Sequence, residues 1–462
     1  MRRSVLGLGL LSITCCCASL AHADEVDEAI KTQMERNHIP ALVYAVVKDG
    51  HVIRSQALGS ADLELKKPAT QDNLFEIGSL TKQVTAMGVM ILLEAGKLQL
   101  EDPISKYLPD IPPAWKEVKI RNLLYQNSGL PDYVFVPKLT LIDRFDRNVF
   151  MSEMAKLPVD FPPGEAWAYS NTNYALLGWI IEAVASEPYT QFIEENVLRP
   201  VGMTHTSFSD GKDLLGLAKG YLRQGITVIP SPRGPASIKS DSGLISTLDD
   251  LLKWDEALSG LRLVGRNSYT AMWTRGKLNS GRVKPYGTGW NLSMPFSTPY
   301  MGHGGNSAGY SAGISRFPKT RLSVIVLTNI YPLNAESIAK QIAELVEPAV
   351  KPTPFKEMVD PDPERTKKVR RAIEALSINR PDPAVMEPEA CAPMRTARAK
   401  QAGAGPWRQV IFVDEFTLGD VKHQGQDVLL TYQIKSMGKS YLAVVLWSPN
   451  NKLAQAQLYG GE

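Results

Sequence analysis

Ser79 and Lys82 are the residues of this chain whose types and spacing most directly indicate chemistry. They open a segment with helical periodicity, and residues three apart on a helix share one face, so the lysine amine can reach the serine hydroxyl. A serine hydroxyl is a poor nucleophile until a neighbouring base takes its proton. The N–H groups and partial positive charge of a helix N-terminus lie beside the same hydroxyl. This pair therefore predicts nucleophilic catalysis by Ser79, with Lys82 as its base.

The S-x-x-K pattern alone is not specific, because the chain contains it at Ser79, Ser209, Ser337 and Ser436. An ordinary solvated serine and lysine explain each of the last three. The helix that follows Ser79 is different, since it is apolar nearly all round from Met87 to Leu92 and is expected to be buried. A lysine is almost never fully buried unless it has a partner, so its presence in this helix indicates a specific role. We therefore place the nucleophile at Ser79.

A second candidate motif is Tyr169-Ser170-Asn171, introduced by Phe161–Gly164, which reads F-P-P-G. A phenol near a lysine can pass a proton to a leaving group, and an asparagine amide can orient a substrate carbonyl. The same Tyr-x-Asn pattern also occurs at Tyr125-Gln126-Asn127. The Pro-Gly introduction and the helical pattern after Tyr169 favour the second copy.

The third motif is His303-Gly304-Gly305, just before a predicted hairpin. Glycines let a substrate lie against the backbone, and an N–H group there can complete an oxyanion hole with the N–H of Ser79. A flexible turn beside a surface histidine is the alternative interpretation. His423-Gln424-Gly425 shows that the pattern also arises elsewhere.

The elements that must hold these motifs come from both ends of one domain. β-patterns at 41–47 and 51–58, joined by Asp49-Gly50, predict a hairpin, and a second hairpin is expected at 310–317 and 322–329. Helical periodicity dominates between them, at 81–95, 174–186 and 247–259, and a helix is expected at 334–345. We expect an α/β (α+β) fold, in which one antiparallel sheet is built from both chain ends around a helical insertion.

The C-terminal part predicts a second, small α+β domain. Residues 351–363 carry four prolines and predict a linker, followed by a helix at 364–376 and strands at 409–413, 427–435, 440–447 and 453–458. The expected organisation is a signal peptide at 1–23, a catalytic domain at 24–350, the linker at 351–363 and the small domain at 364–462. A helix over 24–38 would begin the catalytic domain.

Residues 1–23 have the pattern of a secretory signal. Arg2 and Arg3 precede an apolar run, and Ala21-His22-Ala23 is a small-x-small cleavage site. A retained anchor is the alternative, but the apolar run is shorter than a membrane span needs. We expect a periplasmic or secreted protein that is cleaved after Ala23 and keeps no membrane segment. Only Cys391 would remain in it, so no intramolecular disulfide forms.

The composition excludes several other classes. A formal charge of +3 without a basic run gives no sign of a nucleic-acid partner. The six histidines show neither His-x-His nor H-E-x-x-H spacing, so we expect no metal and no other cofactor. The expected partner is a small-molecule or peptide substrate, and the oligomeric state is left open.

The three motifs in this order resemble the serine β-lactamase and penicillin-binding superfamily, whose signature is S-x-x-K, Tyr/Ser-x-Asn and K-T-G. The likeness covers about residues 27–348 and is strongest to the branch of class C β-lactamases, D-alanyl-D-alanine carboxypeptidases, D-aminopeptidases and esterases. Four further stretches look like that branch: 123–131, 197–206, 242–257 and 286–290. The resemblance implies Ser79 as nucleophile, Lys82 as its base or the partner of the base, and Tyr169 as general acid/base. It also implies that Asn171, His303 and Gly305 contact substrate, and that the N–H groups of Ser79 and Asn306 bind the oxyanion.

This chain departs from the superfamily in having no K-T-G, and His303 stands where that lysine would be. A permanent lysine charge holds a substrate carboxylate, whereas a histidine near neutral pH is mostly uncharged. We therefore expect hydrolysis of small esters, amides or D-amino-acid peptides. A true β-lactamase or D-alanyl-D-alanine carboxypeptidase, with a cation such as Arg316 in place of the lysine, is one alternative. A non-catalytic peptidoglycan- or ligand-binding protein of the same fold is another.

Overall fold

The computed structural model describes residues 13–140, 142–293 and 299–460, and of residues 13–24 and 402 only the backbone. The chain divides into two compact units, neither of which is one continuous segment. Unit 1 comprises Met1–Ile91, Thr190–Trp273 and Gly289–Pro352. Unit 2 comprises Leu92–Tyr189, Thr274–Thr288 and Thr353–Glu462. The domain boundaries at 23, 350 and 363 stay predictions.

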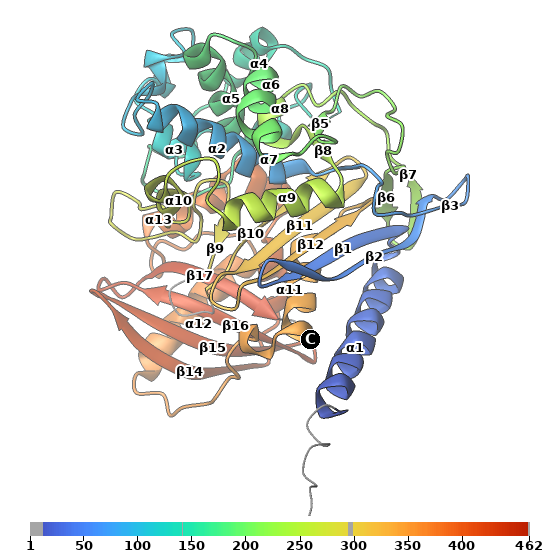
Figure 1. The fold of residues 1–462 in the computed structure, drawn as a ribbon. Helices are drawn as coiled ribbons and strands as arrows, with labels where there is room; N and C mark the ends of the chain where they lie inside the picture. The colour runs from blue at the N-terminus through green and yellow to red at the C-terminus, as the bar shows by residue number, and fades with distance from the viewer. Residues whose placement is uncertain (1–12, 141, 294–298, 461–462) are drawn as a thin grey trace, which may run out of the picture. The chain divides into compact units, whose positions relative to one another are not determined.

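Unit 1 is built on a seven-stranded sheet in the order β3-β2-β1-β12-β11-β10-β9 (Figure 1). Its long strands are β1 (Ala41–Lys48), β2 (His51–Asp62), β10 (Met301–Ser307), β11 (Tyr310–Phe317) and β12 (Leu322–Thr328). Neighbouring strands among these five all pair antiparallel, and β1 lies between β2 and β12. The prediction of one antiparallel sheet assembled from two distant parts of the chain is confirmed.

Two helices pack on one face of this sheet, α1 (Ile13–Asn37) and α11 (Ala335–Val346). The buried side chains of β1 and β12 on this face alternate along each strand, as the two-residue period of a strand requires. Apolar side chains of α1 and α11 at helical spacing complete the same core, which includes Val26, Ile30, Tyr44, Val326, Ile338 and Ile342. The core thus fixes the sheet that carries the third motif.

The helical part of unit 2 contains α3 (Ile120–Leu124), α4 (Arg147–Met154) and α5 (Asn171–Ala185). Its C-terminal part is an antiparallel sheet in the order β14-β15-β16-β17 with the helix α12 (Pro363–Ser377). These strands are β14 (Glu415–Gln424), β15 (Asp427–Ser436), β16 (Lys439–Trp447) and β17 (Leu453–Gly460). The expected small α+β element is confirmed as a sheet with a helix.

The remaining elements are short, apart from α2 (Thr81–Glu94), which follows the 3₁₀ turn η1 (Gly78–Leu80), and α9 (Leu248–Ser259). The other helices are α6 (Tyr189–Ile193), α7 (Arg199–Val201), α8 (Lys239–Ser242), α10 (Arg266–Met272), α13 (Pro388–Cys391) and α14 (Ala397–Ala402). The other strands are β3 (Lys67–Pro68), β4 (Phe75–Glu76), β5 (Ser207–Phe208), β6 (Tyr221–Gln224), β7 (Thr227–Pro230), β8 (Leu244–Ser246), β9 (Asn291–Leu292) and β13 (Ile330–Tyr331).

One local prediction was wrong, and the structure excludes one alternative interpretation. Residues 409–413 were expected to form a strand, but Gly405–Val410 is a 3₁₀ turn and the first strand of the C-terminal sheet is β14. A short apolar run does not distinguish a strand from a buried turn, and Val410 is buried in the core of that sheet. The segment 303–305 lies within strand β10 and is not a flexible turn.

The N-terminal helix begins earlier than expected, because α1 runs from Ile13 through the predicted cleavage site. Arg2 and Arg3 of the predicted signal lie outside the described residues. Among the residues that the structure describes, no helix combines the length and the apolar character that crossing a bilayer requires.

Candidate active site

Ser79 and Lys82 lie on consecutive turns, Ser79 in η1 and Lys82 in the first turn of α2. The Nζ of Lys82 donates to Ser79 Oγ at 3.0 Å and to the backbone oxygen of Asp241 at 2.8 Å. Lys82 is fully buried. A buried amine needs hydrogen-bond partners, and here one of them is the candidate nucleophile. The predicted contact between the two side chains is therefore present.

The turn that carries Ser79 is held by its own neighbours. Thr81 donates its hydroxyl to the Gly78 oxygen at 2.7 Å, which closes η1 against the start of α2. Thr85, one turn further, donates to the Ser240 oxygen at 2.6 Å and so binds α8 to the helix. The apolar side chains of α2 are buried around it, as its pattern predicted. The base is thus placed by α8, which the sequence analysis did not include in the site.

Strand β10 approaches the nucleophile turn so closely that only glycine fits at the contact. A Cβ atom on Gly78, whose φ is +50°, would lie 2.5 Å from the backbone nitrogen of Asn306. A Cβ atom on Gly305 would lie 1.9 Å from the Ile77 oxygen and 3.1 Å from the Ser79 nitrogen. The amides of Ser79 and Asn306 therefore lie in one small region of unit 1, as an oxyanion hole requires.

His303 is buried in β10, and its Nδ1 donates to the backbone oxygen of Gly304 at 2.6 Å. Burial lowers the pKa of its imidazole to about 4, against a smaller rise caused by the Glu336 carboxylate. The positive charge of Lys82 lowers that pKa further. The imidazole is thus neutral at neutral pH, and a neutral ring that donates from Nδ1 carries its lone pair on Nε2.

Arg316, the alternative cation, is engaged elsewhere in unit 1. Its Nε donates to Asp255 at 2.7 Å and its Nη2 to Ser259 Oγ at 2.7 Å, both on α9. Only 7% of the residue is exposed. The suggestion that Arg316 replaces the missing lysine is therefore not supported, since turning it would leave the buried Asp255 carboxylate unpaired.

The other S-x-x-K serines lack a buried lysine. Lys212, Lys340 and Lys439 are exposed or half-exposed, and the first two pair with Asp210 and Glu336. Their serines have an ordinary structural explanation, as expected.

Tyr169 and Asn171 lie in unit 2, where Asn171 is the first residue of α5. The backbone N–H of Asn171 donates to Asp132 Oδ1 at 3.0 Å, and its Nδ2 lies 3.1 Å and 3.2 Å from the two oxygens of that carboxylate. The ring of Tyr169 packs edge-on against Tyr286, with centroids 6.1 Å apart. A buried carboxylate thus holds the helix start that follows Tyr169.

The competing Tyr-x-Asn motif at 125–127 holds the segment that carries the motif at 169–171. Gln126 Oε1 accepts from the N–H of Ser170 at 2.9 Å and from Asn173 Nδ2 at 2.6 Å. The Gln126 backbone oxygen accepts from the N–H of Ala168 at 3.1 Å. Gln126 therefore binds the residues before and after Tyr169 in the chain. The motif at 125–127 thus has a structural role.

Unit 1 brings together Ser79, Lys82, His303, Gly305 and Asn306, and unit 2 brings together Tyr169 and Asn171. Three residues that hold these groups, Gln126, Asp132 and Asp241, were not predicted from the sequence. Gln126 lies within the quoted stretch 123–131 and Asp132 directly follows it, whereas Asp241 precedes the stretch 242–257. Each acts through an oxygen atom whose partner is distant in sequence, so residue spacing carried no signal for it.

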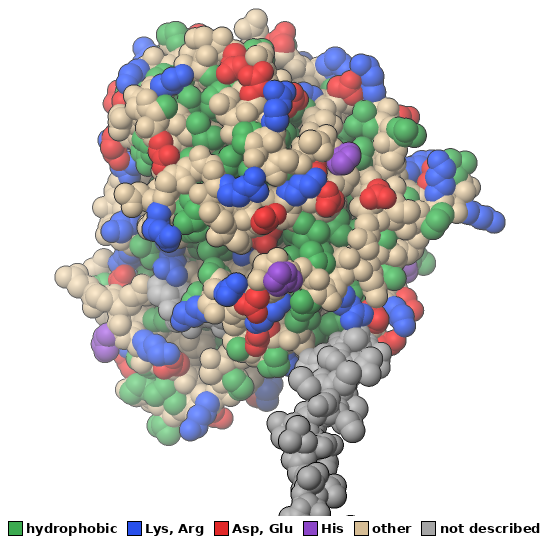
Figure 2. Space-filling view, viewed as in Figure 1, with side chains coloured by type: hydrophobic (Ala, Val, Ile, Leu, Met, Phe, Trp, Pro, Cys, Tyr) green, Lys and Arg blue, Asp and Glu red, His purple; other side chains and the backbone are tan. Residues whose placement is uncertain are grey.

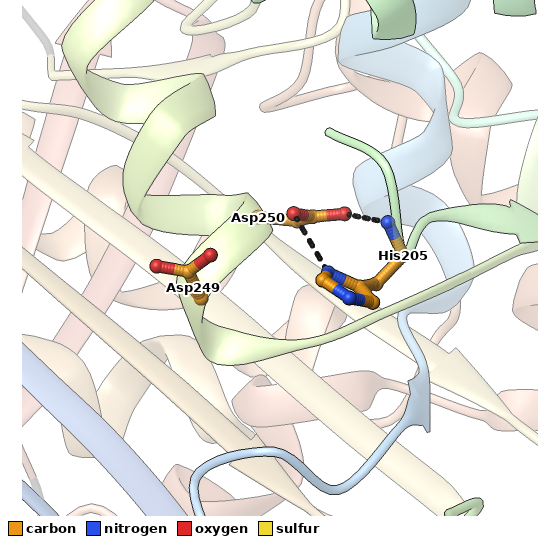
Figure 3. A group of neighbouring side chains, drawn as sticks. All are labelled: His205, Asp249 and Asp250. Atoms are coloured by element: carbon orange, nitrogen blue, oxygen red, sulfur yellow. Dashed lines mark hydrogen bonds and ion pairs between the residues drawn. The ribbon is translucent and has the colours of Figure 1, made fainter. Parts of the chain in front are cut away.

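A cluster of His205, Asp249 and Asp250 is the arrangement of metal-ligating side chains that stands out in the described part of the chain (Figure 3). Its carboxylates already have partners. Lys253 donates to Asp249 at 2.7 Å and to Asp250 at 2.9 Å, and Asp250 also accepts from the His205 backbone N–H. The single charge of Lys253 is shared between the two carboxylates, so we assign the cluster a structural role at the start of α9.

Comparison with known proteins shows the family to which the chain belongs. The chain is 30% identical to penicillin-binding protein 4* of Bacillus subtilis over 320 residues, which cover 65% of this chain and 70% of that protein. Its fold is similar to that of an octameric penicillin-binding protein homologue from Pyrococcus abyssi, with a TM-score of 0.61, 23% identity, and coverage of 95% of this chain and 98% of that one. It is also similar to the D-amino acid amidase of Ochrobactrum anthropi SV3, with a TM-score of 0.60, 23% identity, and coverage of 70% and 99%. The beta-lactamase family model matches residues 26–347, and the chain belongs to that family.

Proposed function

We propose that this protein is an exported serine hydrolase that forms an acyl-enzyme on Ser79. The observation that carries the proposal is the fully buried Lys82, whose Nζ lies 3.0 Å from Ser79 Oγ. Burying a lysine costs free energy, and placing it on a hydroxyl at a helix start gives that hydroxyl a base. Membership of the beta-lactamase family supports the same assignment.

In the proposed reaction Ser79 Oγ attacks the substrate carbonyl carbon while Lys82 takes the hydroxyl proton. The N–H groups of Ser79 and Asn306 stabilise the negative oxygen of the tetrahedral intermediate. We propose that Tyr169 and Asn171 act on the same substrate, Asn171 by orienting it. Tyr169 gives a proton to the leaving alcohol or amine as the C–O or C–N bond breaks. Water then hydrolyses the acyl ester and restores Ser79.

We infer that the substrates are small esters, amides or D-amino-acid peptides. The D-amino acid amidase among the similar structures supports this class. So does His303, because a neutral imidazole cannot give a substrate carboxylate the permanent charge that a lysine gives. Cleavage of a β-lactam or of a carboxylate-terminated D-alanine peptide would then lack that charge at this position.

The intact mass of the protein after brief exposure to a panel of esters, D-amino-acid amides and β-lactams tests this function. We expect the mass of one acyl group to be added with esters or amides, and digestion to place it on Ser79. An adduct with β-lactams alone would favour the β-lactamase alternative. Absence of any adduct and of turnover across the panel would favour a non-catalytic binding protein.

The pH dependence of the reaction tests the role of His303. Because the imidazole has a pKa of about 4, its protonated form becomes abundant only as the pH falls towards that value. We expect kcat/KM for nitrocefin, relative to that for p-nitrophenyl acetate, to stay constant from about pH 8 to about pH 6. A relative increase centred near the ordinary histidine value of about 6.5 would contradict the neutral assignment.

A lysine in place of His303 tests directly whether a charge at this position selects the substrate. His303→Lys should raise kcat/KM for nitrocefin relative to p-nitrophenyl acetate about ten- to hundredfold, the value of one charge-assisted hydrogen bond. An unchanged ratio in a folded variant would show that position 303 does not select the substrate.

Export is the remaining part of the proposal, supported by the signal pattern of residues 1–23. We expect N-terminal sequencing of the exported protein to begin near Asp24. Protein that still starts at Met1, or that stays with membranes after a carbonate wash, would argue against cleavage.

A further inference from the structure

Arg398 connects the C-terminal segment to the Tyr169 motif within unit 2. It lies on α14, and its Nη1 donates to Asp132 Oδ2 at 3.1 Å, across 266 residues of sequence. Its guanidinium carbon lies 5.0 Å from the centroid of the Tyr169 ring. One arginine of the C-terminal segment therefore touches both the ring proposed to move a proton and the carboxylate that holds Asn171.

Asp132 needs such a partner. Only 3% of its side chain is exposed, and its two oxygens receive the backbone N–H and the Nδ2 of Asn171. These donors are neutral, so they do not cancel the carboxylate charge. A buried carboxylate without a counter-ion is strongly destabilised, and Arg398 supplies that charge. Its 44% exposed side chain keeps contact with solvent while it does so.

The placement of Arg398 is supported by other contacts of the C-terminal segment inside unit 2. Arg282 donates from Nε and Nη2 to the two oxygens of Asp427, both at 2.9 Å. Ser280 donates to Glu389 at 2.9 Å. Paired hydrogen bonds between a guanidinium and a carboxylate fix orientation as well as distance. The C-terminal segment is thus bound to this unit at several points.

We propose that Arg398 is a positioning residue, through which the C-terminal segment holds Tyr169 and Asn171 in the orientation that the reaction requires. This inference rests on the proposed function and assigns the C-terminal segment a part in it. Arg398 neutralises Asp132, which fixes Asn171 at the start of α5, and its guanidinium covers the face of the Tyr169 ring. Without it the phenol loses its fixed orientation at the step in which a leaving group takes its proton.

The test uses the full-length chain and compares Arg398→Ala with Arg398→Lys and with Arg395→Ala, a control on an exposed arginine three residues earlier. For p-nitroanilide substrates we expect Arg398→Ala to lower kcat about tenfold or more, with KM changed less than about twofold. Arg398→Lys should recover part of kcat, because it keeps the charge, and Arg395→Ala should match the wild type.

Labelling of Ser79 by a fluorophosphonate separates positioning from misfolding. Fluoride leaves without a proton from Tyr169, so Arg398→Ala should be labelled within about twofold of the wild-type rate. Unchanged amide turnover in Arg398→Ala would overturn this inference and leave the proposed function standing. Equal losses of labelling and turnover would overturn it too, because they indicate general damage. A wild type that is not labelled at Ser79 would overturn the proposed function itself.

Discussion

Ser79→Ala is expected to abolish acyl-enzyme formation and to lower kcat by about 10³-fold or more. The loss follows from chemistry, because the hydroxyl that Lys82 Nζ contacts at 3.0 Å is the proposed nucleophile and alanine removes it. Steady-state turnover of the best ester, together with intact mass after brief exposure to it, measures both effects. Ser337→Ala is the matched control, since Ser337 begins another S-x-x-K segment whose lysine is partly exposed.

Variants of the partners should behave as one unit with Ser79. Lys82→Ala and Tyr169→Phe are each expected to lose orders of magnitude in kcat, and the double variant with Ser79→Ala should be little worse than Ser79→Ala alone. Near-normal turnover in Ser79→Ala would contradict the assignment of Ser79 as the nucleophile, as would a fluorophosphonate adduct on another serine. Additive losses would show that the residues act in separate steps.

Gly305→Ala is expected to have the second largest effect, a loss of about 10²- to 10³-fold in kcat. Its Cβ atom would lie 1.9 Å from the Ile77 oxygen, so β10 must move away from η1. The same movement separates the amides of Ser79 and Asn306 that are proposed to bind the oxyanion. Steady-state kinetics and the melting temperature of the variant together distinguish a displaced oxyanion hole from an unfolded protein.

Gly304→Ala provides a control one residue away in the same strand. Its Cβ atom would meet nothing closer than the Glu336 carboxylate at 3.5 Å, an ordinary contact distance. We expect near-normal kcat in this variant. If Gly304→Ala and Gly305→Ala lose activity equally, the close approach of β10 to η1 is not what the reaction requires.

The space-filling view shows why charge patterns on the surface carried little information about this site. Basic and acidic side chains are interspersed over the visible face (Figure 2). The charged group proposed to do chemistry, Lys82, is fully buried. A net charge describes the solvated surface and long-range attraction, and it does not report a single buried amine.

The sequence by itself determined the features that depend on local periodicity. Ser79 and Lys82 meet because they lie three residues apart at the start of a helix. The hairpins 41–58 and 310–328 form because their turns and β-rich runs are local. The strand predicted at 409–413 is absent from the structure. A short apolar run is too short to show a period, so it does not distinguish a strand from a turn.

Only the tertiary structure decided the features that depend on burial and on distant contacts. The pKa of His303 is about 4 because the folded sheet buries the ring, a property absent from the sequence pattern. Gly305 is required by the approach of Ile77, and Asp132 is paired with Arg398 across 266 residues. Such contacts form between segments whose spacing along the chain has no period, so the electrostatics of the site follow from packing.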